Sequence, residues 1–253
     1  MTGLHRQSLR DRTYWAIIAF VRGVFRLWAI PFDLRGQDNL PTTGPGVVAA
    51  NHIGYLDFTF IGLAAANRGR MIRYLAKGSV FRMPVVGPLM GAMGHIPVDR
   101  GSGSSAYRHA DDVLARGELV GFFPEGTISR AWMLKPFKRG AAALAHRQQV
   151  LLIPVITWGG HRVLTVDGHF SLRRRIPVTV IVGVPIAPDP GRSVDDLNSL
   201  LRDRMAAMLD QAQRDYPDRP RRLRDRWWLP AQLGGSAPDS AAAAVIDAAK
   251  IRG

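Results

Sequence analysis

The stretch Ala49-Ala50-Asn51-His52-Ile53-Gly54-Tyr55-Leu56-Asp57 decides the fold, because an apolar strand over 47–50 runs out there into a histidine and an aspartate five residues apart. In an unbroken helix five residues turn through about 500°, so the two side chains would diverge by roughly 140°. They converge only if the backbone bends, and Gly54 permits a bend. A bent loop from a strand into a helix is where an open α/β sheet presents reactive groups. The stretch predicts either a general base oriented by a carboxylate or only a turn and helix cap.

The composition favours one large domain with a basic surface. The chain has 253 residues, of which 47% are hydrophobic, enough for a single core. Its formal net charge of +14 indicates a surface that attracts nucleic acid, an anionic bilayer or phosphorylated substrates. The absence of cysteine excludes a disulfide, a thiolate-ligated zinc and a cysteine nucleophile, and it is typical of a cytoplasmic chain.

We expect residues 1–35 to hold an amphipathic helix at a membrane interface. Its apolar part, 13–30, is interrupted by Arg22 and Arg26, so it is too polar to span a bilayer, and no small-residue cleavage site of a signal peptide follows it. A narrow polar stripe recurs at helical spacing, formed by Arg12, Ala19, Arg22 and Arg26. Such a helix lies either at the bilayer surface, with its arginines at lipid phosphates, or on the protein's own core.

Between residues 36 and 213, apolar runs alternate with helical patterns, as in an α/β protein. Strands are expected at 47–50, 71–76, 96–98, 118–123, 150–157 and 176–183. Helices are expected at 58–67, from 101–105 to about 116, at 138–147 and at 193–213. The segment 31–46 is rich in Pro, Gly, Asn and Asp and is expected to be a loop. The alternation predicts a single domain with a mostly parallel central sheet flanked by helices.

Two further segments have a distinctive composition. The uncharged run 83–98 contains several prolines and glycines, which argues against a regular helix, and its Met, Val and Leu residues form either a wall for an acyl chain or a buried turn. Within the tail 214–253, five arginines lie between positions 219 and 226, directly before Trp227 and Trp228, which predicts membrane contact, nucleic-acid binding or a plain self-packed tail. Its end, 236–253, is Ala-rich and either a loose helix or disordered.

Five blocks of residues occur in an order and spacing that resemble a known family. They are Asn51, His52 and Asp57; Ala76, Lys77, Pro84 and Gly87; Gly94, Ile96, Asp99 and Arg100; Phe123 through Thr127; and Ile153, Pro154 and Val155. This set resembles the glycerolipid acyltransferases of the lysophosphatidic acid acyltransferase type. The resemblance covers residues 36–186.

The resemblance implies an enzyme of phospholipid biosynthesis without a metal or other cofactor. An acyl group would move from a thioester, on coenzyme A or acyl carrier protein, to the free hydroxyl of a lysophospholipid. The simplest acceptor is 1-acyl-glycerol-3-phosphate, which would give phosphatidic acid. We expect the protein to sit peripherally on the cytoplasmic face of the cell membrane, with an anionic membrane surface as its partner and no nucleic acid.

The residue types suit this chemistry. His52 would take the hydroxyl proton while Asp57 fixes its tautomer, and N–H groups near Gly126 and Thr127 would stabilise the developing oxyanion. Cations would bind the acceptor's phosphate, and the candidates are Lys77 and Arg100. Glu125 would accept a hydrogen bond from a hydroxyl of the acceptor lipid or from Arg100.

The chain departs from the family pattern at two positions. Gly54 stands where the family usually has serine, and Ile128 where it often has arginine. Arg130, two residues further on, is the candidate replacement for that arginine. The acceptor is therefore either lysophosphatidic acid or a different glycerolipid or lysophospholipid.

Two other function classes remain to be compared. A non-catalytic protein that binds membrane or nucleic acid would use the charge of +14, but no recognised nucleic-acid module is present. A metal-dependent hydrolase would need a ligand cluster, whereas the other histidines lack ligand spacing: His95, His109, His146, His161 and His169.

Overall fold

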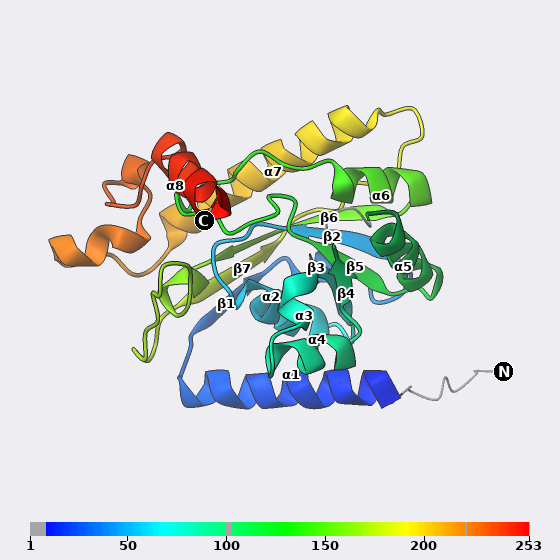
Figure 1. Ribbon diagram of the computed structural model, residues 1–253, viewed down its shortest axis with the longest axis horizontal. Helices are drawn as coiled ribbons and strands as arrows, with labels where there is room; N and C mark the ends of the chain where they lie inside the picture. The colour runs from blue at the N-terminus through cyan, green and yellow to red at the C-terminus, as the bar shows by residue number, and fades with distance from the viewer. Residues whose placement is uncertain (1–8, 100–102, 221, 253) are drawn as a thin grey trace.

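The computed structural model describes residues 9–99, 103–220 and 222–252, and its centre is a twisted sheet (Figure 1). In these ranges seven strands pair in the order β1-β7-β6-β2-β5-β3-β4. Their bounds are β1 Phe32–Arg35, β2 Gly46–Ala50, β3 Ile72–Lys77, β4 Ile96–Val98, β5 Leu119–Phe122, β6 Leu151–Trp158 and β7 Val178–Val182. Neighbouring strands are parallel except β6 and β7, which are antiparallel. The predicted single α/β domain with a mostly parallel sheet is confirmed.

Helices cover both faces of this sheet. On one side lie α1 (Leu9–Leu27), α2 (Asp57–Ala66), and the short α3 (Gly78–Phe81) and α4 (Val86–Ala92), seen along the lower part of Figure 1. The other face packs against α5 (Gly103–Ala115), α6 (Gly140–Gln148) and α7 (Val194–Asp215). The C-terminal helix α8 (Ser240–Arg252) lies near the end of α7 (Figure 1).

Strand β2 shows why the sheet sits at the centre of the core. All five of its residues are buried, and successive side chains point to opposite faces. Val47 and Ala49 belong to the core beneath α5–α7, whereas Val48 and Ala50 belong to the core shared with α1 and α2. A strand buried on both faces is apolar throughout, which explains its unbroken apolar sequence.

Two predictions of local structure are wrong. The segment 31–46 is not all loop, because β1 adds to the free edge of β7 by parallel pairing, and that tertiary pairing outweighs the turn-rich composition. The run 83–98 does contain a helix, α4, although it includes Pro88. Pro88 is the third residue of α4, within the first turn, where a backbone N–H has no helical acceptor to lose.

Helix α1 has one face in the core and one in solvent. Tyr14, Ile18 and Phe25 are buried against α2, and the Phe25 ring lies 5.0 Å from that of Phe60. Phe20 and Leu27 are 72% and 77% exposed on the outer face. The inner face of α1 therefore packs on the protein's own core, whereas its outer face has the apolar side chains expected for contact with a bilayer surface. The boundaries 1–35, 36–213 and 214–253 stay a prediction.

Candidate active site

The motif blocks gather at one edge of the sheet because they follow neighbouring parallel strands. Strands β2, β5, β3 and β4 lie side by side in the same direction, so their carboxyl ends meet at the same edge. His52 follows β2, Glu125 follows β5, and Lys77 is the last residue of β3. The carboxyl ends of such strands are where α/β proteins place their reactive groups.

His52 and Asp57 form a direct pair at this edge. The Nδ1 atom of His52 lies 3.0 Å from Oδ2 of Asp57, and the same oxygen accepts the backbone N–H groups of Ile53 at 2.7 Å and Gly54 at 2.8 Å. Since an ionised carboxylate can only accept, the ring proton sits on Nδ1 and the lone pair on Nε2 stays available. Asp57 is fully buried, whereas the His52 side chain is 21% exposed. The pair therefore presents a basic nitrogen from a rigid support.

The loop between these two residues is held by close packing on the segment after β6. The N–H of Tyr55 donates to the carbonyl of Leu164, and the hydroxyl of Thr165 donates to the carbonyl of Ile53. A Cβ atom at Gly54 would lie 2.9 Å from the Leu164 carbonyl oxygen, so a serine has no room here. Gly54 has no positive φ, so glycine is required by this contact rather than by the bend we expected it to supply.

Asn51 fixes the start of the loop by acting as an extra rung of the sheet. Its buried side-chain amide donates to the Thr157 carbonyl at 3.0 Å and accepts the Thr157 N–H at 2.7 Å. The amide thereby satisfies both backbone groups of a β6 residue and joins the ends of β2 and β6.

Glu125 joins the two loops of the site through its carboxylate. Its Oε1 accepts the N–H of His52 and its Oε2 accepts the N–H of Lys135, both at 2.9 Å. Burial raises the pKa of Glu125 to about 8, although these two N–H groups act in the opposite direction. Just before it, the Phe123 ring stacks on His52 with centroids 4.2 Å apart. We infer that Glu125 positions His52, since both of its oxygens already accept backbone N–H groups.

Gly126 and Thr127 form the exposed surface of this loop. The N–H of Gly126 donates to the Phe123 carbonyl, which leaves the N–H of Thr127 as the candidate oxyanion donor. A Cβ on Gly126 would lie 2.7 Å from the Lys138 ammonium, and its φ of +75° also favours glycine. The ammonium of Lys135 donates to the Thr127 hydroxyl at 2.7 Å. Two lysines that sequence reasoning missed therefore border the site.

The other predicted cations occupy different environments. Lys77 is exposed at the end of β3, and Arg100 lies outside the described residues. Ile128 is buried in the core, so its position does not face the site. Arg130 is 9% exposed and forms ion pairs with Asp167 and Asp247. Lys135 and Asp247 could not be identified as neighbours of the site from the sequence, because their contacts join segments that are far apart in the chain.

Two of the remaining histidines are core residues. Burial lowers the pKa of His95 and of His161 to about 3, with the charges of Arg73 and Arg162 acting in the same direction. His95 accepts the N–H of Tyr74, and His161 contacts the Trp228 carbonyl at 2.9 Å. Within the described ranges, no three His, Asp or Glu side chains converge as metal ligands would.

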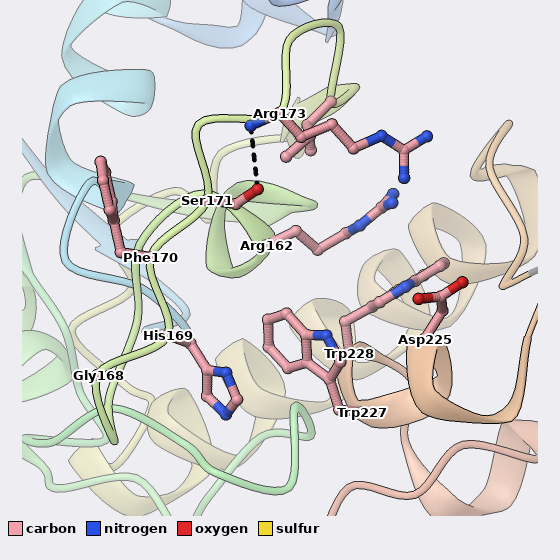
Figure 2. Close-up of a pocket in the computed structure, with 10 residues that line it drawn as sticks. Arg162, Gly168, His169, Phe170, Ser171, Arg173, Asp225, Trp227 and Trp228 are labelled. Carbon is pink, nitrogen blue, oxygen red and sulfur yellow. Dashed lines mark hydrogen bonds between the residues drawn. The ribbon is translucent and has the colours of Figure 1, made fainter.

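A separate hollow of about 350 Å³ lies between the segment after β6 and the tail tryptophans (Figure 2). Arg162 and Arg173 reach into it from one side, with Asp225 opposite them and Trp227 and Trp228 along another wall. The Arg162 guanidinium lies 4.1 Å from the centre of the Trp228 ring and is 5% exposed. None of the residues that line the hollow belongs to a motif block, so the carboxyl end of the sheet, with His52 and Asp57, remains the candidate site.

Comparison with known proteins supports the family. The acyltransferase family model matches residues 31–158, half of the chain. The chain is 30% identical over 199 residues to the chloroplastic 1-acyl-sn-glycerol-3-phosphate acyltransferase of Arabidopsis thaliana, which covers 74% of this chain and 53% of the relative. It is 28% identical to the 1-acyl-sn-glycerol-3-phosphate acyltransferase of Bacillus subtilis, which covers 69% and 80%. The chain spans about half the length of the Arabidopsis relative and of the chloroplastic 1-acyl-sn-glycerol-3-phosphate acyltransferase of Brassica napus.

A solved structure supports the fold. The crystal structure of the 1-acyl-sn-glycerophosphate acyltransferase from Thermotoga maritima matches with a TM-score of 0.71 and 21% sequence identity, covering 85% of this chain and 86% of that one. The family match spans β1 to β6 and includes both loops of the candidate site. This chain belongs to the acyltransferase family.

Proposed function

We propose that the protein is an O-acyltransferase that moves a fatty acyl group from acyl-CoA to the free hydroxyl of 1-acyl-glycerol-3-phosphate, giving phosphatidic acid. The observation that carries this proposal is the pairing of His52 with Asp57, which leaves Nε2 of His52 available at the carboxyl end of the sheet. The names of the plant and Bacillus relatives support the acceptor class.

The geometry gives each residue a step in one transfer. Nε2 of His52 takes the acceptor's hydroxyl proton as the oxygen attacks the thioester carbon, and Asp57 stabilises the imidazolium. The negative charge that forms on the carbonyl oxygen is met by the N–H of Thr127. When the intermediate collapses, the carbon–sulfur bond breaks and the thiolate takes the proton back from His52. The acceptor oxygen is itself the nucleophile, so no acyl-enzyme forms.

We further propose that α1 holds the protein peripherally on the cytoplasmic face of the membrane. No helix in the described part of the chain is both long and apolar enough to cross a bilayer. The outer face of α1 presents Phe20 and Leu27 with Arg12 and Arg26 towards its ends, a pattern suited to the headgroup boundary. Helix α4, which contacts α1, adds the exposed Val85 and Leu89 region. An acyl chain would leave the bilayer along this surface.

An acceptor screen tests the activity. Purified protein is given one acyl-CoA with 1-acyl-glycerol-3-phosphate, other lysophospholipids or monoacylglycerol, and thiol release and product mass are followed. We expect phosphatidic acid from wild type and a rate about 10²- to 10⁴-fold lower for His52→Ala, the usual contribution of a general base. The matched control is His109→Ala, an exposed histidine on α5, which should keep full rate. Equal rates for wild type and His52→Ala would refute the proposal.

Vesicle binding tests the membrane proposal. We expect sedimentation with phosphatidylcholine–phosphatidylglycerol vesicles to weaken by about tenfold or more in a Phe20→Ser/Leu27→Ser variant, since burying one such side chain contributes roughly 1.5–3 kcal/mol. Val184→Ser removes an equally exposed apolar residue elsewhere and should bind like wild type. Unchanged binding by the double variant would contradict the role of α1.

A further inference from the structure

The C-terminal helix α8 reaches the candidate site through one carboxylate. Oδ1 of Asp247 accepts a hydrogen bond from Nε of Arg130 at 2.8 Å, and Oδ2 accepts one from Nζ of Lys135 at 2.5 Å. A second contact joins Lys250 of α8 to Asp167, which also pairs with Arg130. Partial burial raises the pKa of Asp247, but hydrogen bonds from Lys135 and Arg130 outweigh it, so the pKa lies below its usual value. The carboxylate is therefore charged at neutral pH.

The two cations that hold Asp247 belong to the loop after β5. The backbone N–H of Lys135 donates to Glu125, and its ammonium also donates to Thr127. Arg130 lies three residues after Thr127, the last residue of the block that begins at Phe123. Asp247 thus lies beside the residues that support His52, although it is 190 positions after Asp57 in the sequence.

The geometry at Asp247 is one that a phosphate can reproduce. Its two oxygens are each held by a different cation, and a phosphate offers the same pair of acceptors with more charge. The position where the family often has arginine holds the buried Ile128, so a cation must come from elsewhere in this chain. In this structure Asp247 accepts a hydrogen bond from each of these two cations, so a phosphate that took the same two donors would displace it.

The docking of α8 is weak enough for such an exchange. Val245 is 70% exposed, and five alanines of this helix are also exposed to solvent. The pair of Lys250 with Asp167 is open to water, with side chains 56% and 40% exposed, and those of Lys135 and Asp247 are 26% and 20% exposed, so water and dissolved anions can reach these contacts. A phosphate group of the substrate can therefore compete with α8.

We infer that Arg130 and Lys135 form the site for the acceptor's phosphate, and that Asp247 fills this site until the phosphate displaces it. This inference rests on the proposed acyltransferase function for the identity of the anion. Helix α8 then acts as a strap that competes with the acceptor, and Asp247 sets how tightly a phosphorylated acceptor binds.

Amide hydrogen exchange tests the displacement without any acyl transfer. We expect glycerol 3-phosphate, and more weakly inorganic phosphate, to speed exchange across α8 in the full chain, while sodium chloride at equal ionic strength does not. Asp247→Asn should show the faster exchange before any anion is added. Exchange in α8 that is the same with and without saturating glycerol 3-phosphate would overturn the inference.

Kinetics test the competition. We expect Asp247→Asn to lower the KM for 1-acyl-glycerol-3-phosphate by about two- to fivefold with kcat unchanged, since a partly exposed ion pair accounts for up to about a factor of five. Lys135→Gln in that background should raise KM again, and monoacylglycerol, which lacks the phosphate, should show neither effect. Asp210→Asn makes the same charge change on the exposed face of α7 and is the control.

The two measurements separate the possible failures. A KM for the phosphorylated acceptor that Asp247→Asn leaves at the wild-type value would overturn the strap. If no acceptor is acylated by any variant, the proposed function fails, whereas the exchange experiment still decides whether Arg130 and Lys135 form an anion site.

Discussion

In the loop from Asn51 to Asp57, buried side chains hydrogen-bond to buried backbone groups, whereas α8 reaches the same end of the sheet through side-chain ion pairs that water can enter. The first region has no competitor in solution for its contacts, because Asp57 and Asn51 are fully buried. The second can exchange its carboxylate for another anion. The comparison teaches that buried packing fixes His52 and Asp57, while ion pairs supply most of the polar contacts that hold α8 beside them.

Changes at Asp57 should break the first region most strongly. Asp57→Asn keeps a carbonyl oxygen for the N–H groups but loses the charge that stabilises the imidazolium, so we expect acyl transfer to fall by about 10²- to 10⁴-fold with little loss of stability. Asp57→Ala leaves those donors unpaired, each at roughly 1–3 kcal/mol. Urea unfolding and rate assays distinguish the two, and an Asp57→Ala protein as stable as wild type would contradict the described network.

Packing at Gly54 gives the next largest effect. An added Cβ meets the Leu164 carbonyl oxygen at 2.9 Å and backbone atoms of His161 at 3.3 Å, so we expect Gly54→Ala to lower the free energy of unfolding by about 1–3 kcal/mol. Gly23→Ala on α1 meets no atom within 4 Å and should be neutral or slightly stabilising. Equal stability of the two variants would show that the loop shifts to accommodate the added Cβ and would contradict the close packing described here.

The pH dependence of stability tests Glu125. Its pKa of about 8 in the folded protein lies above roughly 4.3 in the unfolded chain, so between these values the folded state holds a proton that the unfolded state has released. The free energy of unfolding should therefore fall as pH rises through this window. Glu125→Gln has no titrating group at this position. We therefore expect its free energy of unfolding to fall by at least about 1 kcal/mol less than that of wild type across the window. Parallel curves would mean that Glu125 is ionised throughout.

The smallest effect should come from the second region. Lys250 and Asp167 are 56% and 40% exposed, so Lys250→Gln should change the global free energy of unfolding by less than about 1 kcal/mol. The same variant should nevertheless speed amide exchange within α8. A large global loss of stability would mean that α8 is part of the core and would weaken the contrast drawn here.

The sequence predicted those parts of the site that depend on local spacing. The pairing of His52 with Asp57, and the strand ends that present His52 and Glu125, follow from apolar runs and a single loop. Strand β1 could not be predicted in this way, since its pairing depends on β7, which lies over a hundred residues later. The contact between Arg130 and Asp247 joins positions 117 residues apart and left no periodic signal.

Nitrogen NMR of the His52 ring tests the central claim most directly, because the proposed base depends on which nitrogen holds the proton. In the neutral imidazole of wild type we predict a protonated Nδ1 and an unprotonated Nε2, as the 3.0 Å contact with Asp57 requires. Asp57→Ala should shift the ring towards a mixture of tautomers. A wild-type ring whose proton sits on Nε2 would contradict the account, because no lone pair would then face the acceptor.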